Sequence, residues 1–279
     1  MRAEELVKAG DVGGALKELQ DAVRKQPANA AYRVFLFQLL SVLGQWERAI
    51  TQLNVASELD TETALMGNVC RSLLNAEAMR ADVFAGRRTP LVFGEPEEWI
   101  GWLVQANQFT ASGHHAQASD LRAQAFEAAP AIPGTVNGHA FEWIADADTR
   151  LGPMTEIIID GRYYWIPISR IHRLATQPPQ DLRDLVWCPA SFEWSNGGQS
   201  VGFIPTRYPG SAAADEDAIR LARKTVWEEP AAGVYTGLGQ RMFTTDVDDH
   251  PLLEVRMLVL DNLVPAPDGA DAAAEATES

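Results

Sequence analysis

Histidine, cysteine and carboxylate side chains are the residues of this sequence that could carry catalysis or bind a metal. His139 and Glu142 lie three residues apart, a spacing that places two side chains on one face of a helix. A zinc site needs at least one further ligand, and the sequence contains no HExxH motif and no CxxC pair. His172 and Cys188 are further polar candidates, but no nucleophile motif surrounds either of them. No catalytic, metal-binding or cofactor-binding residue is therefore predicted, and the chain is not expected to be an enzyme.

The charge balance excludes two classes of partner. The 279 residues include 23 Lys or Arg and 38 Asp or Glu, for a net charge of −15. An acidic surface repels phosphate, so neither nucleic acid nor an anionic membrane is an expected partner. The N-terminus lacks the apolar core of a signal peptide, and no window approaches the roughly 18 apolar residues of a membrane span. A cytoplasmic protein is expected, in which Cys70 and Cys188 are reduced thiols.

Repeated helices are expected to position any binding surface in the first half. A glycine and two alanines recur with a period of 34 residues, and their spacing returns once more further along the chain. This pattern is typical of the tetratricopeptide helix-turn-helix repeat, in which small residues let neighbouring helices approach and glycine ends a helix in a left-handed conformation. The recurring positions are Gly10, Ala15 and Ala22, then Gly44, Ala49 and Ala56, then Gly113, Ala118 and Ala125.

Apolar residues at helical spacing predict helices over residues 30–43, 62–85 and 97–112. Helix pairs of this repeat type leave a groove that commonly receives a peptide or a helix. Tyr32, Arg33 and Phe35 lie on the first helix of the second repeat. These three residues are therefore candidates for binding a partner.

The second half has a β-rich pattern. Two β-rich runs flank Asp160-Gly161, and two more flank residues 196–198, which predicts two hairpins. Further strands are expected over 239–245 and 252–260, and helices over 140–149, 168–174 and 215–224. The prediction is an α+β protein with a tetratricopeptide-like helical repeat domain at 1–133 and a β-rich C-terminal α+β domain at 134–264. Residues 265–279 carry no aromatic or branched aliphatic side chain and are expected to form a disordered acidic tail.

Aromatic residues offer a second candidate surface. Tyr163, Tyr164 and Trp165 lie on one predicted strand, so Tyr164 faces the opposite side from its two neighbours. Core packing explains the pattern, and so does an aromatic surface, since Tyr and Trp are favoured at protein interfaces. Both interpretations stay open, and the three residues are further partner-binding candidates.

Four runs together resemble the ImpE/SciE family, also called TagJ, an accessory protein of the bacterial type VI secretion system. The runs are residues 10–53, the linker GRRTPLVFGEPEEW at 86–99, YYWIPISRI at 163–171 and GQRMF at 239–243. The first run is common to many tetratricopeptide proteins, whereas the linker and the two later runs make the resemblance specific. It covers nearly the whole chain up to about Leu263.

The resemblance implies an adaptor without enzymatic activity. Such a cytoplasmic protein would bind the N-terminal helix of the small (TssB-like) subunit of the contractile sheath, and would be linked to sheath recycling by the ATPase ClpV. Helix-in-groove binding is the expected mode. Two alternatives stay open: a general tetratricopeptide-like scaffold for another cytoplasmic client, and an enzyme or ligand-binding module in the β-rich half that uses His139, Glu142, His172 and Cys188.

Overall fold

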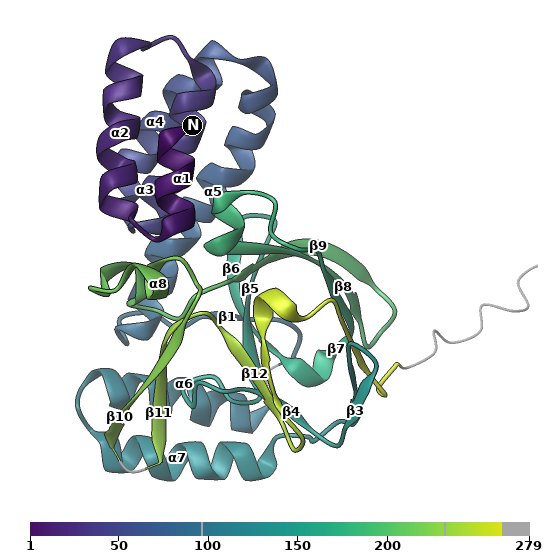
Figure 1. Ribbon diagram of the computed structural model, residues 1–279. Helices are drawn as coiled ribbons and strands as arrows, with labels where there is room; N and C mark the ends of the chain where they lie inside the picture. Colours follow the sequence, from purple (N-terminus) through teal and green to yellow (C-terminus); the bar gives the residue numbers. More distant parts are fainter. Residues whose placement is uncertain (96, 232, 264–279) are drawn as a thin grey trace, which may run out of the picture.

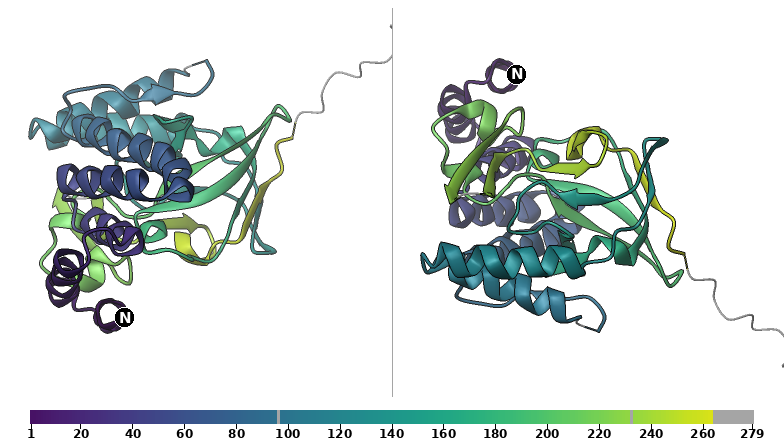
Figure 2. Two further views of the ribbon diagram at one scale, coloured as in Figure 1. Left: turned by 90° about the horizontal axis from the view of Figure 1, so that it is seen from above. Right: turned by 90° about the horizontal axis from the view of Figure 1, so that it is seen from below.

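The computed structural model describes residues 1–95, 97–231 and 233–263. Five consecutive helices form an array at one end of the molecule, and a second helical hairpin, α6–α7, lies at the opposite end (Figure 1). Both views of Figure 2 show the helices on one side and the sheet on the other. The helices are α1 (Arg2–Ala9), α2 (Val12–Lys25), α3 (Ala30–Val42), α4 (Trp46–Leu59), α5 (Thr61–Phe84), α6 (Glu98–Ala111) and α7 (His115–Ala128).

The residues of the repeat pattern end the helices, cap them and let them pack closely. Gly10, Gly44 and Gly113 all adopt positive φ, of 86°, 65° and 80°, directly after a helix, as predicted. Asp11 and Asn29 cap the following helices, since their side chains accept hydrogen bonds from the backbone amides of Gly14 and Tyr32. Five of the six recurring alanines are fully buried, Ala15, Ala49, Ala56, Ala118 and Ala125, whereas Ala22 is half-buried.

A nine-stranded sheet dominates the second half, in the order β1-β6-β5-β9-β8-β7-β14-β2-β3. All neighbours are antiparallel except β1 and β6. Its strands are β1 (Leu91–Val92), β2 (Gly134–Val136), β3 (His139–Phe141), β5 (Met154–Ile159), β6 (Arg162–Pro167), β7 (Ile171–Thr176), β8 (Trp187–Trp194), β9 (Gln199–Pro205) and β14 (Met257–Leu260).

Smaller elements complete the β-rich half. One sheet has the order β13-β12-β4, and β10 pairs with β11. The bounds are β4 (Ile144–Asp146), β10 (Thr225–Ala231), β11 (Val234–Gly239), β12 (Met242–Thr245) and β13 (Asp249–Pro251). Short helices are α8 (Asp217–Arg220) and the 3-10 turns η1 (Ile168–Arg170), η2 (Leu182–Leu185), η3 (Ser211–Ala213) and η4 (Leu252–Glu254).

The predicted α+β fold and both hairpins are confirmed, but two of the predicted helices are wrong. Residues 140–149 form β3, β4 and the turns around them, because β4 pairs with β12, about a hundred residues later. Non-local pairing of this kind overrides a local helical pattern. Residues 168–174 form one 3-10 turn and then enter β7, while the predicted helix at 215–224 contracts to α8.

The two halves share one hydrophobic core. Leu19 and Leu53 of the helical array belong to the same buried cluster as Met154, Trp165 and Trp187 of the β-rich half. Strand β1, which comes from the helical half, also joins the large sheet beside β6. The helices end at α7 and the β-rich half begins at β2, close to the predicted boundary at 133/134, but the division into separate domains stays a prediction. The predicted tail, 265–279, lies outside the described residues.

Candidate partner-binding groove

A groove of about 900 Å³ runs between the helical array and the β-rich half. Helices α1 and α3 and the junction of α4 with α5 form one side, and the segment that contains η2 forms the other. We call this surface the α3–η2 groove. It is lined by Glu4, Val7, Lys8, Ala30, Ala31, Val34, Phe35, Gln38, Leu59, Asp60, Thr63, Pro179, Gln180, Asp181, Leu182 and Leu185.

The helical side of the groove is mainly apolar and partly accessible. Val34 and Phe35 of α3 are half-buried, and Phe35 packs against the core beneath it. Leu59, the last residue of α4, is 43% exposed at the margin. An apolar surface that is only partly covered gains free energy when a partner removes it from water, at about 25 cal/mol per Å².

The opposite side is held in place by a buried carboxylate. The side chain of Asp184 accepts hydrogen bonds from the backbone amides of Gln180 and Asp181, at 2.9 and 3.0 Å. The hydroxyl of Thr206 donates to the Asp184 carbonyl at 2.7 Å, which ties η2 to the end of β9. Leu182 and Leu185 are thereby fixed against the shared core with part of each side chain facing the groove.

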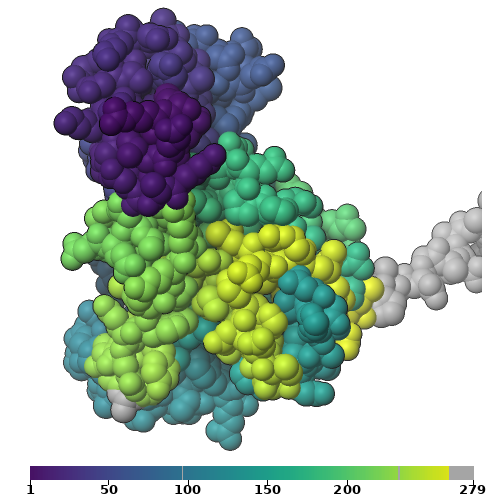
Figure 3. Space-filling view, viewed as in Figure 1, coloured from purple at the N-terminus to yellow at the C-terminus, as the bar shows by residue number. Residues whose placement is uncertain are grey.

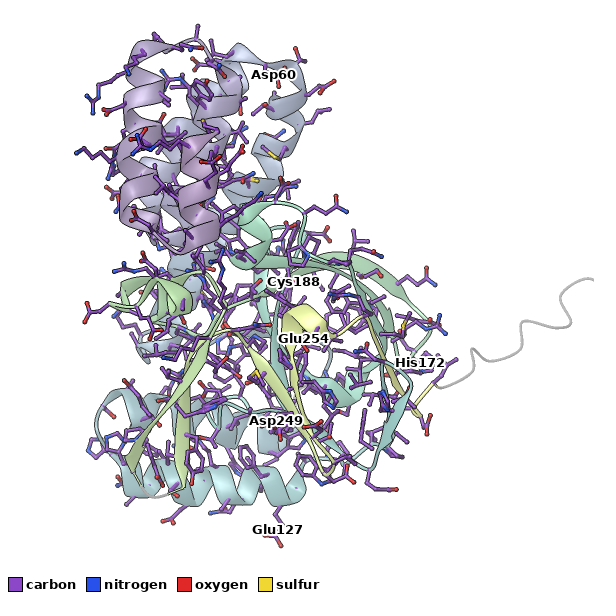
Figure 4. All side chains as sticks on the ribbon, in the orientation of Figure 1. Asp60, Glu127, His172, Cys188, Asp249 and Glu254 are labelled. Atoms are coloured by element: carbon purple, nitrogen blue, oxygen red, sulfur yellow. The ribbon has the colours of Figure 1, made fainter. Side chains whose placement is uncertain are left out.

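Charged residues at the edge of the groove are mostly acidic. Glu4, Asp60 and Asp181 lie there with one basic residue, Lys8. Asp60, labelled in Figure 4, caps α5: it accepts hydrogen bonds from the hydroxyl of Thr63 at 2.5 Å and from its amide at 2.8 Å. These bonds lower the pKa of Asp60. The edge therefore favours a partner that carries positive charge beside its apolar face.

Only one of the three candidates on α3 lines this groove. Phe35 does, whereas Arg33 donates to the carbonyl of Pro27 and to Oε1 of Gln52, both at 2.8 Å, and so fastens α3 to α4. Tyr32 is half-buried against the core. The η2 side was missed by sequence reasoning, although Asp181 and Asp184 have the spacing of a capping box, which marks the start of a helical turn.

The aromatic strand does not provide an exposed surface. Tyr163 and Trp165 are buried, and Trp165 donates its indole N–H to the Tyr163 hydroxyl at 2.7 Å. Tyr164 packs on the other face of the sheet, edge-on to Phe93. The burial of Tyr163 and Trp165 favours the core-packing interpretation over an aromatic surface, and partner binding by Tyr163, Tyr164 and Trp165 stays a prediction.

A buried ionic network surrounds Tyr163, and it joins α5 to the β-rich half. Arg80 of α5 donates to both carboxylate oxygens of Glu156 on β5, at 2.6 and 3.0 Å. Arg241 also donates to Glu156, and it binds Asp146 of β4 as well. Tyr163 donates its hydroxyl to Glu156 at 2.6 Å. We call Arg80, Asp146, Glu156 and Arg241 the central ion network.

Burial and pairing shift the two carboxyl groups in opposite directions. Burial raises the pKa of Glu156, but the charges of Arg80 and Arg241 outweigh it and bring the pKa down to about 2. Asp146 has Arg241 as its cationic partner, and burial dominates, so its pKa rises to about 6. Perturbed groups often mark active sites, but structural ion networks perturb pKa values too. This network is enclosed, and its charges bind each other.

The polar candidates of the second half do not come together. His139 and Glu142 are exposed near β3, and the predicted shared helix face does not exist. His172 of β7 and Cys188 of β8 lie far apart in Figure 4, and burial raises the pKa of Cys188 to about 12. Among the described residues, no group of three or more His, Cys, Asp or Glu side chains is arranged to hold a metal. Within the same ranges, no helix is long and apolar enough to cross a membrane.

Comparison with known proteins shows the family to which the chain belongs. A sequence profile of the ImpE protein matches residues 138–259, and a tetratricopeptide-repeat profile matches residues 6–73. The type VI secretion system accessory component TagJ of Pseudomonas aeruginosa is 49% identical over 258 residues, which cover 92% of this chain and 90% of that protein. A crystal structure of a protein from Vibrio parahaemolyticus superposes with a TM-score of 0.85 at 28% identity, over 93% of this chain and 97% of that one. At this identity and coverage, and as the linker and the later runs predicted, the chain belongs to the ImpE family.

Proposed function

We propose that this protein is a cytoplasmic adaptor of the type VI secretion system without enzymatic activity, and that it binds the N-terminal helix of the small contractile-sheath subunit. The observation that carries the proposal is the α3–η2 groove, a partly apolar channel between the helical array and the segment that contains η2. Its relative TagJ is an accessory component of that secretion system. Tetratricopeptide repeats, which match residues 6–73, commonly serve protein–protein interaction.

The groove suits an amphipathic helix better than a small molecule. Its volume of about 900 Å³ is near the upper limit of roughly 1,000 Å³ for ligand pockets, and its lining comes from α1, α3, the α4–α5 junction and the η2 segment. Helices bind such surfaces through apolar residues at i, i+3 or i+4, and i+7. Val34, Phe35 and Leu185 would contact that apolar face, while Glu4 and Asp60 would meet basic side chains beside it.

Titration calorimetry with a peptide of the sheath subunit's N-terminal helix, from the same organism, tests this proposal. We expect micromolar or tighter binding, which corresponds to about −8 kcal/mol. Serine substitutions on the apolar face of the peptide should abolish it. Leu59→Asp at the groove margin should weaken it at least tenfold, whereas Val247→Asp, in the turn between β12 and β13, should not change it. Absence of binding to the folded chain would contradict the proposal.

The link to ClpV is proposed as indirect, through the bound sheath subunit. The described surface offers no separate feature that requires a direct ATPase contact. ClpV should therefore be retained on the immobilised protein when the sheath subunit is present and should be lost when it is omitted. Retention without the sheath subunit would show a direct contact and overturn this part of the proposal.

A further inference from the structure

One polar side chain lies in the lining of the α3–η2 groove within an apolar run of α3. Residues 35–40 read FLFQLL, and Gln38 is the polar member of that run. Phe37, Leu39 and Leu40 are fully buried, and Gln38 is only 7% exposed. An apolar side chain would suit such a position better, because burial of an amide costs free energy unless the amide forms hydrogen bonds.

The helical period turns Gln38 toward the groove. Ala30, Val34 and Gln38 are spaced four residues apart on α3, so they lie on one face of the helix, and all three line the groove. The stripe from Ala30 to Gln38 is about 12 Å long at 1.5 Å per residue, which matches about two turns of a bound helix. Gln38 ends this stripe and would therefore meet a side chain near one end of the bound segment.

The amide of Gln38 has no hydrogen-bond partner within the described residues, unlike the other polar side chains around it. Arg33 and Ser41 of the same helix both donate to groups within the helical array. Thr63 is the other buried polar side chain in the described lining of the groove, and its hydroxyl donates to Asp60. Gln38 therefore keeps two N–H donors and one carbonyl acceptor for whatever fills the groove.

We propose that Gln38 is a specificity-determining residue of the groove, whose amide selects a partner helix with one uncharged hydrogen-bonding side chain, an amide or a hydroxyl, in its otherwise apolar face. The inference rests on the proposed function and names the chemistry of the helix bound there. An entirely apolar helix would bury the Gln38 amide without a partner, which disfavours that helix. A charged side chain would lose its hydration beside an amide that offers no counter-charge.

Titration calorimetry of Gln38→Met with the peptide of the sheath subunit's N-terminal helix tests the proposal. Methionine fills a similar volume but forms no strong hydrogen bond, so this variant should bind the peptide about tenfold more weakly or worse. Its free energy of unfolding should stay the same or rise, because a buried amide without a partner is removed. Gln105→Met is the matched control: it makes the same change at an exposed position of α6 and should leave the Kd unchanged.

The outcomes separate this inference from the proposed function. A folded wild type that does not bind the peptide overturns both. A wild type that binds, together with a Gln38→Met variant that binds equally well or more tightly, overturns only the selection by Gln38. Weaker binding that accompanies an equal loss of folding stability would show that Gln38 supports the structure of the groove, and would also overturn the selection.

A scan of the peptide identifies the side chain that meets Gln38. Each Asn, Gln, Ser or Thr of the peptide is replaced in turn by the apolar residue of nearest shape. One replacement should weaken binding to the wild type about tenfold and should hardly affect binding to Gln38→Met, because the partner of that side chain is already absent. If every replacement has the same effect on both proteins, no side chain of the peptide is coupled to Gln38, and the proposal is overturned.

Discussion

Two of the regions that join the helical array to the β-rich half do so by different physical means. The central ion network buries four charged side chains that bind each other, and Arg80 and Arg241 both bind Glu156. The α3–η2 groove joins the same halves mainly through apolar contacts and leaves part of that surface accessible. A third junction is visible in Figure 3, where the purple helices rest on the green segment: the amide of Val12 donates to Asp217 at 2.9 Å.

This difference assigns stability to the central ion network and partner recognition to the α3–η2 groove. The two carboxyl groups of the network have pKa values shifted in opposite directions, and both are buried and already paired, so the network acts in holding α5 against the sheet. The groove, by contrast, offers surface that a partner can cover. In this protein the perturbed carboxyl groups therefore mark the structural joint, and the accessible apolar channel marks the candidate binding site. Four variants can break or sharpen this distinction.

Arg241→Met should have the largest effect, on stability alone. It leaves Asp146 and Glu156 buried with fewer cationic partners, and breaking a buried ion pair costs about 3–5 kcal/mol. Denaturant unfolding measures the loss. Arg2→Met removes an exposed pair with Glu18 and should cost less than about 1 kcal/mol. A loss for Arg241→Met as small as that of the control would mean that the network does not hold the halves together.

Glu156→Gln should cost about 2–3 kcal/mol at neutral pH, because Arg80 and Arg241 lose their shared counter-charge. The pKa of Glu156 is about 2 in the folded chain, below its ordinary value of 4.5. Its contribution is therefore complete above about pH 4.5 and is lost as the pH falls toward 2. The melting temperatures of the wild type and of the Glu156→Gln variant, measured between pH 2 and 7, should converge as the pH falls toward 2. A constant difference across that range would contradict the assignment.

The effect of Asp146→Asn on stability should change with pH in the opposite direction to that of Glu156→Gln. The pKa of Asp146 is about 6 when folded against 3.8 ordinarily, so its stabilising contribution is complete below about pH 3.8 and is lost as the pH rises through 6. Asparagine cannot lose a proton. The stability of the variant relative to the wild type should therefore increase by about 1–2 kcal/mol between pH 4 and 7. Unfolding curves at the two pH values measure it, and an unchanged difference would show that Asp146 does not titrate there.

Local signals explain which parts of these regions could be predicted from the sequence. The helical array was predictable because its glycines, caps and buried alanines act within one or two turns, and Phe35 followed from the same period. The network could not be predicted, because Arg80, Glu156 and Arg241 come from segments 76 and 85 residues apart and meet only through sheet pairing. The later runs of the family pattern nevertheless contain Arg241 of the network and Tyr163, which donates its hydroxyl to Glu156.

The η2 side of the groove was only partly predictable from the sequence. Its capping box is a local signal, and Asp181 and Asp184 indicate a helical turn. Nothing local indicates that this turn packs against α3, because that contact depends on the path of the connection between β7 and β8. The α3 side of the groove was therefore predictable from the repeat pattern, whereas the η2 side could be located only in the tertiary structure.

Lys8→Glu should produce the smallest effect, and it tests the groove without changing the central ion network. Lys8 is the one basic residue among the groove-lining side chains of the described chain, and it is exposed. If basic side chains of the sheath peptide meet Glu4, Asp60 and Asp181, removing this like charge should tighten binding about two- to fivefold, mainly through faster association. The gain should shrink in high salt, since exposed charges are screened over about 8 Å at physiological ionic strength. Stability should change by less than about 0.5 kcal/mol, as for other surface substitutions. Weaker peptide binding by the variant would mean that an acidic side chain of the peptide contacts Lys8, and would reverse the charge expected of the partner helix.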